Sequence, residues 1–391
     1  MSKNTLLPLK NSSMKLGIIS DCIHYKMPDG KIGTENHILL RQLEALCSYY
    51  SAALICCPFG KYDSSKVIST YTNPHINFTS VPVVGGSSVK AKLQIGIAFF
   101  KWLTAFKKID RFSDVVYQRF PNNLNIPGFF YFWLKRKPVF ATYTGTWNKY
   151  KSEPATYSFQ RRLLKNNFNG PVWVYSNEKF NNKKIHPGFS PSYSTQEWDE
   201  EIFPVKNRIE RIQAEGLPIF KLITVGTLIS YKNQIGIIKS CSLLKKRHFP
   251  FSLTIVGDGP MRQDLETLII EKDLQPEVKL VGKKKHAELR ALYRQHDFVV
   301  QAPFSEGFGK VPVEGFFHGV IPVINNISMA GFMTGNEERG FLFDATDEKN
   351  LADKLIEIKS RIDELPAMID KGRAFAKGQT LEQWAKEYYQ T

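Results

Sequence analysis

The sequence has no long apolar run, few cysteines and no paired cysteine motif. A membrane-spanning helix needs about 20 consecutive apolar residues. The most apolar stretches, 93–106 and 126–134, are too short or are interrupted by Lys101. The five cysteines contain no C-x-x-C pair, and an odd number favours a reduced compartment over a disulfide framework. These absences exclude a membrane-spanning chain and a disulfide scaffold, and they predict buried, unpaired cysteines.

The N-terminal residues also lack the features of a secretory signal. They contain no continuous apolar segment and no small-residue cleavage site. We therefore expect a loose tail over residues 1–14 and a cytoplasmic protein, with peripheral attachment to the inner face of the plasma membrane as the alternative.

What is present is typical of a globular protein. The 391 residues are 42% hydrophobic, 23% charged and 13% aromatic, which excludes a disordered or collagen-like chain. At a typical 100 to 200 residues per domain, about two domains are expected.

Positive charge is concentrated in the first half of the chain. Residues 1–200 contain 26 Lys and Arg against 12 Asp and Glu, a balance of +14, while residues 201–391 contain 27 against 25, a balance of +2. The total of +16 suggests an anionic partner, and composition leaves open whether it is nucleic acid, a membrane surface or a phosphorylated ligand. The two halves therefore have different tasks.

The second half alternates between strand and helix patterns. Apolar runs predict strands at 222–226, 253–257, 278–281, 298–301 and 322–324, and helical spacing predicts helices at 287–294, 312–318 and 350–365. Such alternation builds a parallel sheet covered on both faces. It predicts a Rossmann-like domain over residues 206–375.

The first half shows a similar pattern. Strands are expected at 16–20, 52–56, 115–118, 139–143 and 172–175, with a helix that carries Leu39, Leu43 and Leu46. This predicts a second Rossmann-like domain over residues 15–205, joined to the first near 191–218, where the periodicities lapse. Residues 376–391 are expected to form a separate final segment.

Polar and glycine residues follow the predicted strand 298–301. The segment E-G-F-G-K-V-P-V-E-G places Glu306 before a helix and Glu314 about one turn inside it. Gly307 and Gly309 allow close backbone approach, and the amides at the N-terminus of a helix bind phosphate. The sequence therefore predicts a phosphate site flanked by two carboxylates.

This E-x7-E segment resembles the nucleotide-binding segment of retaining family-4 glycosyltransferases with the GT-B fold, also called glycosyl transferases group 1. Three further pieces follow in the family's order. They are Gly226-Thr227 with Lys232, the turn Gly257-Asp258-Gly259-Pro260, and the run 289–300. Near the N-terminus, the loop at Gly33 is similar to the family's glycine loop, and 380–389 is similar to its final helix.

The resemblance implies an α/β GT-B fold, in which two Rossmann-like domains face a cleft and a C-terminal helix crosses back to the first domain. It implies transfer of a sugar from a UDP- or GDP-linked donor to a saccharide or lipid-linked saccharide, as in the assembly of bacterial surface polysaccharide. Glu306 and Lys232 would be catalytic, the lysine stabilising charge on the leaving diphosphate. Donor-binding residues would be Gly33, Gly226, Thr227, Gly257, Asp258, Phe308, Gly309, Lys310, Val311 and Glu314.

Several positions depart from the family's pattern. Thr227 stands where an arginine is common, and Lys310 is offered as its replacement; Ile32 replaces the first glycine of the N-terminal loop. Residues 142–147 carry no histidine where the family often has one. No D-x-D occurs, so we expect no metal and no cofactor beyond the nucleotide sugar.

Structural alternatives stand beside these roles. Either glutamate is compatible with a solvated or capping carboxylate, and Gly257, Asp258 and Gly259 are compatible with a purely structural turn. For Lys232 and Lys310, the alternative is an ordinary surface lysine.

Two segments combine aromatic residues with lysines. In 91–108, Leu93, Ile97, Phe100 and Leu103 form an apolar stripe with Trp102 and Phe106 nearby, and 129–137 (FFYFWLKRK) repeats the combination. One interpretation is a core helix. The other is contact with an anionic membrane surface, which aromatic residues beside lysines favour.

Two other functions remain open at this stage. A nucleotide-sugar epimerase or sugar phosphorylase would share the fold. A basic nucleic-acid-binding protein would explain the charge, but no recognised nucleic-acid module is visible, so we expect no nucleic-acid partner.

Overall fold

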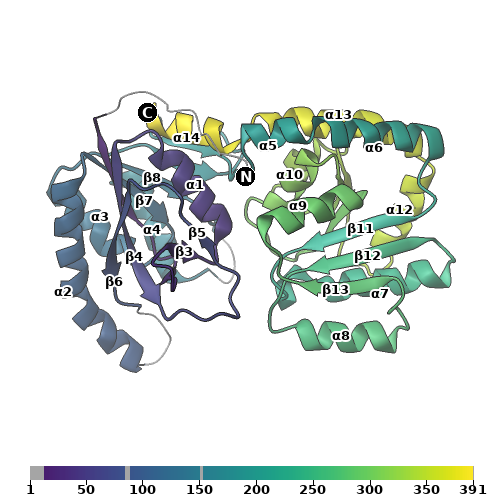
Figure 1. Cartoon of the computed structure of the whole chain (residues 1–391), viewed down its shortest axis with the longest axis horizontal. Helices are drawn as coiled ribbons and strands as arrows, with labels where there is room; N and C mark the ends of the chain where they lie inside the picture. Colours follow the sequence, from purple (N-terminus) through teal and green to yellow (C-terminus); the bar gives the residue numbers. More distant parts are fainter. Residues whose placement is uncertain (1–12, 84–88, 150–152, 391) are drawn as a thin grey trace. The chain divides into compact units, whose positions relative to one another are not determined.

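The chain forms two α/β units (Figure 1). The computed structural model describes residues 13–83, 89–149 and 153–390, with side chains of the 89–112 helix from Ala98 onward. Unit 1 runs to Ser190 and resumes at Leu381, and unit 2 is Pro191–Thr380. The predicted tail 1–14 lies almost wholly outside the described residues.

Unit 1 is built on a mainly parallel sheet. Its strands are β1 (Lys15–Ile19), β2 (His24–Lys26), β3 (Ile32–Thr34), β4 (Ala52–Gly60), β5 (Ser69–Thr70), β6 (Ile76–Val81), β7 (Val115–Phe120), β8 (Val139–Tyr143), β9 (Val172–Tyr175) and β10 (Ile185–Gly188). The parallel strands follow the order β6-β4-β1-β7-β8-β9-β10. The short strands β2, β3 and β5 extend the sheet beside β4, and β3 is antiparallel to both its neighbours.

Helices cover both faces of this sheet. They are α1 (His37–Cys47), α2 (Val89–Phe112), α3 (Asn125–Leu134), α4 (Ala155–Asn166) and α14 (Leu381–Tyr389). Leu43 of α1 and Trp384 of α14 pack in one core cluster, while Phe106 of α2 and Phe132 of α3 pack in another against Ile19. Alternate residues of each buried strand thus face different helix layers.

Unit 2 has six parallel strands. Its elements are α5 (Thr195–Glu200), α6 (Ile202–Glu215), β11 (Phe220–Val225), η1 (Ser230–Lys232), α7 (Gln234–Lys246), β12 (Phe251–Val256), α8 (Arg262–Glu271), β13 (Val278–Gly282), α9 (His286–Gln295), β14 (Phe298–Gln301), α10 (Lys310–Phe317), β15 (Ile321–Asn325), α11 (Ala330–Thr334), β16 (Phe341–Phe343), α12 (Asn350–Lys359), η2 (Ile362–Glu364) and α13 (Leu365–Lys377). The sheet order is β13-β12-β11-β14-β15-β16.

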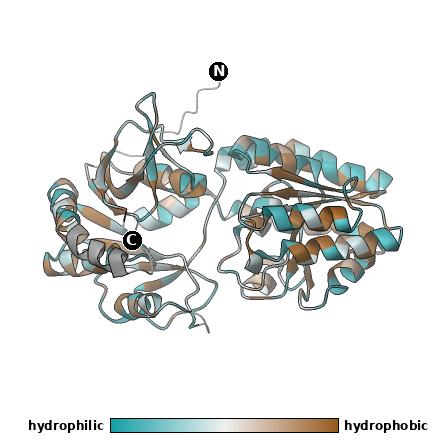
Figure 2. Ribbon diagram, turned by 90° about the horizontal axis from the view of Figure 1, so that it is seen from below, coloured by the Kyte–Doolittle hydropathy of each residue, from teal (hydrophilic) through white to brown (hydrophobic). Residues whose placement is uncertain are grey.

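The core of unit 2 lies between this sheet and its helices. Leu222 and Phe298 pack toward α7, α8 and α12, whereas their neighbours Ile223 and Val299 pack toward Tyr293 of α9. The strands are largely hydrophobic, and the helices alternate between hydrophilic and hydrophobic residues along their length (Figure 2). The predicted fold class, α/β with two parallel-sheet units, is confirmed. That the units face a cleft stays a prediction.

Two sequence interpretations need correction. Residues 191–218, where the sequence shows no clear helical or strand periodicity, contain the helices α5 and α6. The first segment of unit 1 ends at Ser190, whereas the sequence predicts a first domain that ends at 205. The pattern was hidden because α6 buries Arg208 together with Val205 and Ile212, so a charged residue occupies its inner face. The helix predicted at 350–365 is two helices, α12 and α13, separated by η2.

The aromatic segments also divide differently from the prediction. Trp102, Phe106 and Phe132 are buried in unit 1, as a core helix requires. Phe100 is 73% exposed, so it does not belong to the buried face on which Trp102 and Phe106 lie. Leu93 and Ile97 lie outside the described side chains.

Candidate functional site

The candidate site lies where the strand order of unit 2 reverses. β11 is the first strand of the unit, and β12 lies on one side of it while β14 lies on the other. The chain therefore leaves β11 and β14 in opposite directions, which opens a crevice at their carboxyl ends. Both predicted catalytic residues follow these two strands.

Lys232 is held by a short turn after β11. It ends η1, and the next residue, Asn233, has a left-handed backbone (φ 53°) and caps α7 by accepting a hydrogen bond from the Gly236 amide at 3.1 Å. The Phe304 amide donates to the Tyr231 carbonyl at 2.8 Å, which ties this turn to the loop after β14. The position of Lys232 is therefore set by backbone contacts on both sides.

Glu306 meets Lys232 across the crevice. The Lys232 Nζ and Glu306 Oε2 atoms form an ion pair, with both side chains part-exposed. Glu306 Oε1 accepts from the Gly307 amide at 3.1 Å, and Ser328 Oγ donates to the Gly307 carbonyl at 3.1 Å. The structure thus brings together the two predicted catalytic residues, which lie 74 positions apart in the sequence.

The loop then enters α10. Gly309 has φ 72°, a left-handed conformation that favours glycine, and the helix begins at Lys310 with Pro312 in its first turn. Phe308 is buried beside a cavity of only about 40 Å³, which Val311 also lines. A small-molecule pocket usually has about 300 Å³ or more, so a nucleotide would lie on the open side of this loop.

Glu314 has a different environment from Glu306. It is 5% exposed, and its two carboxylate oxygens accept from Ser192 Oγ at 2.7 Å and Tyr293 OH at 3.2 Å. Burial raises the pKa of Tyr293 well above its ordinary value, so its hydroxyl stays a donor. Glu314 is therefore neither a solvated carboxylate nor a partner of Lys232, and its ribose role stays a prediction.

The turns after β11 and β12 pack on one another. A Cβ on Gly257 would lie 1.8 Å from the Gly226 carbonyl oxygen, and one on Gly259 would lie 2.4 Å from that of Leu228. Asp258 Oδ1 accepts from the Gly259 amide at 2.8 Å. These contacts support the structural alternative for the Gly-Asp-Gly turn. Thr227 is exposed beside it.

The first-half candidates lie in unit 1. Gly33 is in β3, buried between β2 and β5. Thr142 is buried, and its hydroxyl accepts a hydrogen bond from Tyr117 OH at 2.8 Å. Its side chain is therefore part of the interior of unit 1. The structure does not relate these residues to the Lys232–Glu306 pair, and a donor role for Gly33 stays a prediction.

Sequence reasoning missed a buried ionic cluster beside Glu314. Glu201, 1% exposed, lies 2.7 Å from both Arg290 Nη2 and Arg294 Nη2 and 3.1 Å from His318 Nδ1. Burial opposes its charge, but the hydrogen bonds from His318 and the arginines hold the pKa of Glu201 well below its ordinary value. The i, i+4 spacing of Arg290 and Arg294 was the available signal.

The described residues include no candidate metal cluster and no candidate membrane span. Within residues 13–83, 89–149 and 153–390, no three His, Cys, Asp or Glu side chains gather as a metal site would require. In the same part of the chain, no helix is long and apolar enough to cross a membrane.

Part of the chain is similar in sequence to known glycosyltransferases. Residues 206–375 match the family described as glycosyl transferases group 1. Over 97 residues the chain is 35% identical to a GDP-mannose:cellobiosyl-diphosphopolyprenol alpha-mannosyltransferase of Xanthomonas oryzae, covering 24% of this chain and 26% of that protein. An uncharacterized glycosyltransferase of Methanocaldococcus jannaschii is 24% identical over 127 residues, 32% of this chain and 36% of the relative. The chain thus spans well under half the length of these relatives.

Solved structures match over nearly the whole chain. Anabaena HepE in complex with UDP and glucose superposes with a TM-score of 0.69 at 16% identity, covering 96% of this chain and 98% of that one. WaaG, a glycosyltransferase involved in lipopolysaccharide biosynthesis, gives 0.66 at 12% identity, covering 95% and 98%. The chain has the two-unit fold of these structures, and within unit 2 residues 206–375 match the family described as glycosyl transferases group 1.

Proposed function

We propose that the protein is a retaining family-4 glycosyltransferase that moves a sugar from a UDP- or GDP-linked donor to a saccharide or lipid-linked saccharide, without a metal. One observation carries the proposal. Lys232 and Glu306 meet at the carboxyl ends of β11 and β14, where a doubly wound sheet binds its ligand. The family match of residues 206–375 supports the same function.

The chemistry follows from the charges at this point. The Lys232 ammonium would neutralise the diphosphate as its bond to the sugar breaks, and electrostatic stabilisation of such developing charge is usually a large part of catalysis. Amides at the N-terminus of α10, near Lys310 and Val311, would bind the same diphosphate. Glu306 would then accept hydrogen bonds from donor-sugar hydroxyls.

The ion pair between Lys232 and Glu306 suits this role. Each charge lowers the cost of holding the other at a part-buried position while no donor is bound. A donor offers phosphate oxygens to the lysine and hydroxyl donors to the glutamate, so both residues exchange one partner for another. The site is thus organised before the donor arrives.

We also propose that unit 1 contacts an anionic membrane at the cytoplasmic face. Phe100, Trp133 and Leu134 are 73%, 48% and 73% exposed, and Lys101, Lys135 and Arg136 are exposed beside them. An interfacial surface combines such apolar and basic side chains. A polysaccharide pathway with a lipid-linked acceptor would place the enzyme there.

A nucleotide screen tests the donor site. We expect UDP- or GDP-sugars to raise the Tm of the wild-type chain, and we expect Lys232→Ala to weaken donor affinity about tenfold to a hundredfold, because a hydrogen bond to a charged group contributes roughly 1.5–3 kcal/mol. Lys239→Ala is the matched control. Lys239 lies on α7 outside the site, and its ammonium pairs with the Glu348 carboxylate. Product NMR then reports whether the anomeric configuration is retained.

Two outcomes would contradict this proposal. A donor shift of unchanged size in both Lys232→Ala and Glu306→Gln would show that the nucleotide binds elsewhere. Turnover that needs inorganic phosphate and releases a sugar 1-phosphate would identify a phosphorylase of the same fold.

A further inference from the structure

Unit 1 contains a large cavity over the carboxyl ends of its parallel strands. The cavity has a volume of about 870 Å³. Four strands reach it: Asp21 follows β1, Pro58 is in β4, Val81 ends β6 and Asn123 follows β7. β1 and β7 are neighbours at which the strand order reverses, so the cavity occupies the place where a doubly wound sheet binds ligands.

The wall of the cavity opposite the strands comes from α2 and α3. These helices pack against each other on one face of the sheet (Figure 1). They contribute Phe99, Trp102 and Leu103 from α2, and Phe130, Tyr131 and Leu134 from α3. Phe99 is 40% exposed and Leu134 is 73% exposed, so apolar side chains continue from the cavity to the surface.

The lining is mostly apolar. Among the described residues that form it, Asp21 carries the only formal charge, Asn123 and Thr156 add an amide and a hydroxyl, and Tyr131 and Trp102 add a phenol hydroxyl and an indole N–H. Each saccharide unit brings several hydroxyls, and a polar group buried without a partner costs roughly 1–3 kcal/mol. The cavity is thus unsuited to a sugar and suited to an aliphatic chain, whose burial contributes about 0.8 kcal/mol per CH₂ group.

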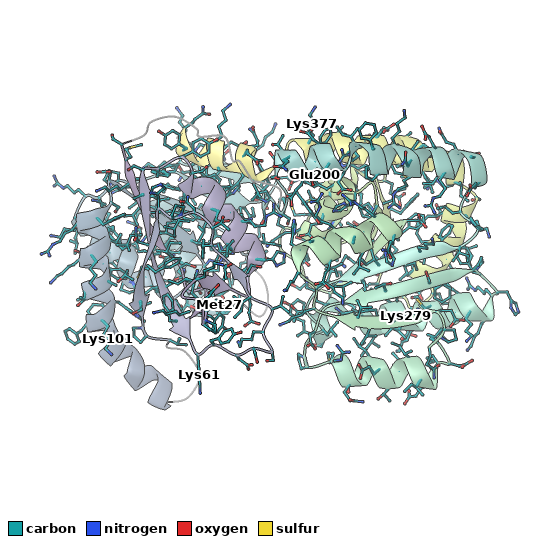
Figure 3. The ribbon with its side chains drawn as sticks, viewed as in Figure 1. Met27, Lys61, Lys101, Glu200, Lys279 and Lys377 are labelled. Carbon is teal, nitrogen blue, oxygen red and sulfur yellow. The ribbon has the colours of Figure 1, made fainter. Side chains whose placement is uncertain are left out.

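Basic residues neighbour the exposed apolar residues of the same two helices in sequence. Lys135 and Arg136 directly follow Leu134 and are exposed. Lys101, between Phe99 and Trp102 in α2, is also exposed, and Figure 3 shows it pointing away from the unit. A ligand with an apolar chain and an anionic phosphate would find both its parts matched here.

We propose that this cavity binds the isoprenoid or acyl chain of a lipid-linked acceptor, with the phosphate of that lipid held by Lys101, Lys135 and Arg136. This inference rests on the proposed function and selects the lipid-linked acceptor over a free saccharide. Phe99 and Phe130 line the chain-binding wall.

Binding of farnesyl phosphate tests the cavity, at concentrations below its aggregation limit. We expect saturable binding to the wild-type chain that inorganic phosphate at equal concentration does not displace. Phe99→Lys and Phe130→Lys, each of which places a charge in the cavity wall, should weaken that binding about tenfold or more. Two variants are used so that a folding defect in one leaves the other as the test, and circular dichroism checks the fold of both.

Phe100→Lys is the matched control, because Phe100 neighbours Phe99 in α2 but does not line the cavity. It should change the affinity for farnesyl phosphate less than about twofold, since the added charge stays in water. Equal weakening by Phe100→Lys and Phe99→Lys, or displacement by inorganic phosphate, would overturn the proposal. UDP- and GDP-sugar binding by the wild-type chain is measured separately. If the wild-type chain bound farnesyl phosphate but no UDP- or GDP-sugar, the proposed function would be overturned and the cavity assignment would stand.

Discussion

At the scale of single residues, the two glutamates of the E-x7-E segment have separate surroundings. Glu306 faces the crevice and pairs with Lys232, whereas Glu314 is enclosed by Ser192 and Tyr293. From the sequence, Glu306 and Lys232 can be placed in the loops after two strands, and their catalytic roles stay predictions. The sequence does not predict the surroundings of Glu314, because Ser192 lies 122 positions away and reaches it only through the tertiary fold.

The buried carboxylate of Glu201 should control the acid stability of unit 2. Its pKa lies below the ordinary value of 4.5, so its charge stabilises the fold above about pH 4.5 and this contribution is lost as pH falls through the lower, folded pKa. We expect Glu201→Gln to lower the free energy of unfolding by about 3–5 kcal/mol at pH 7, because it leaves the part-buried Arg290 guanidinium without its anion. Urea unfolding at pH 7 and at pH 3, well below the unfolded pKa, measures both effects.

The control for that measurement is Glu210→Gln. Glu210 lies on α6 near Glu201 in sequence but is exposed, where it pairs with Lys206 at 3.8 Å. Surface pairs of this kind contribute about 0–1 kcal/mol. Equal losses in the two variants, or a Glu201→Gln loss that is the same at both pH values, would show that the buried cluster does not stabilise the unit.

At the scale of elements, strands with an apolar run were predictable. β8, β9 and β14 have the predicted bounds, because most of their residues are apolar. The strands β2, β3, β5, β6, β10 and β16 were missed. All but β6 have two to four residues, too few to show a clear period, and β6 contains Asn77, Thr79 and Ser80 among its apolar residues. α6 was missed for a different reason: its inner face includes Arg208, whose guanidinium pairs with buried Asp297 at 3.2 Å.

The last helix should be required for the stability of unit 1. Trp384 of α14 is fully buried, and the Tyr388 ring stacks on Trp173 with 4.1 Å between centroids. Buried side chains of this size contribute about 1.5–3 kcal/mol each. We expect a chain shortened to end at Thr380 to lose the cooperative unfolding transition of unit 1, measured by calorimetry.

A chain that ends at Tyr389 is the control, because it keeps Trp384 and Tyr388. It should unfold at the same temperature as the full chain. If the chain ending at Thr380 also kept both transitions at unchanged temperatures, packing by α14 would not stabilise unit 1.

At the scale of the whole molecule, positive charge is concentrated in the first half, where Phe100 and Trp133 are exposed beside basic residues. We expect the protein to sediment with vesicles that contain anionic phospholipid, and to do so less as salt rises. Phe100→Glu together with Trp133→Glu should weaken vesicle binding several-fold, because both side chains are exposed. Ile270→Glu, a 63% exposed position of α8 in unit 2, is the control.

That experiment also decides between a membrane and nucleic acid as the anionic partner. Binding to DNA that is tighter than binding to vesicles and falls steeply with salt would contradict the membrane proposal. So would equal losses in the Ile270→Glu control. Composition alone could not decide this, because a net charge of +16 carries no information on which side chains surround it.

The chain order of the two units has a consequence for biosynthesis. Unit 2 is continuous, but unit 1 is completed only by Leu381, Trp384 and Tyr388, which enter its core after unit 2 has been synthesised. Domains generally fold as units during synthesis. Although unit 1 leaves the ribosome first, unit 2 is the first to have its whole sequence available. The first 190 residues of unit 1, which include all the strands of its sheet, therefore have part of one core face uncovered until α14 has been synthesised.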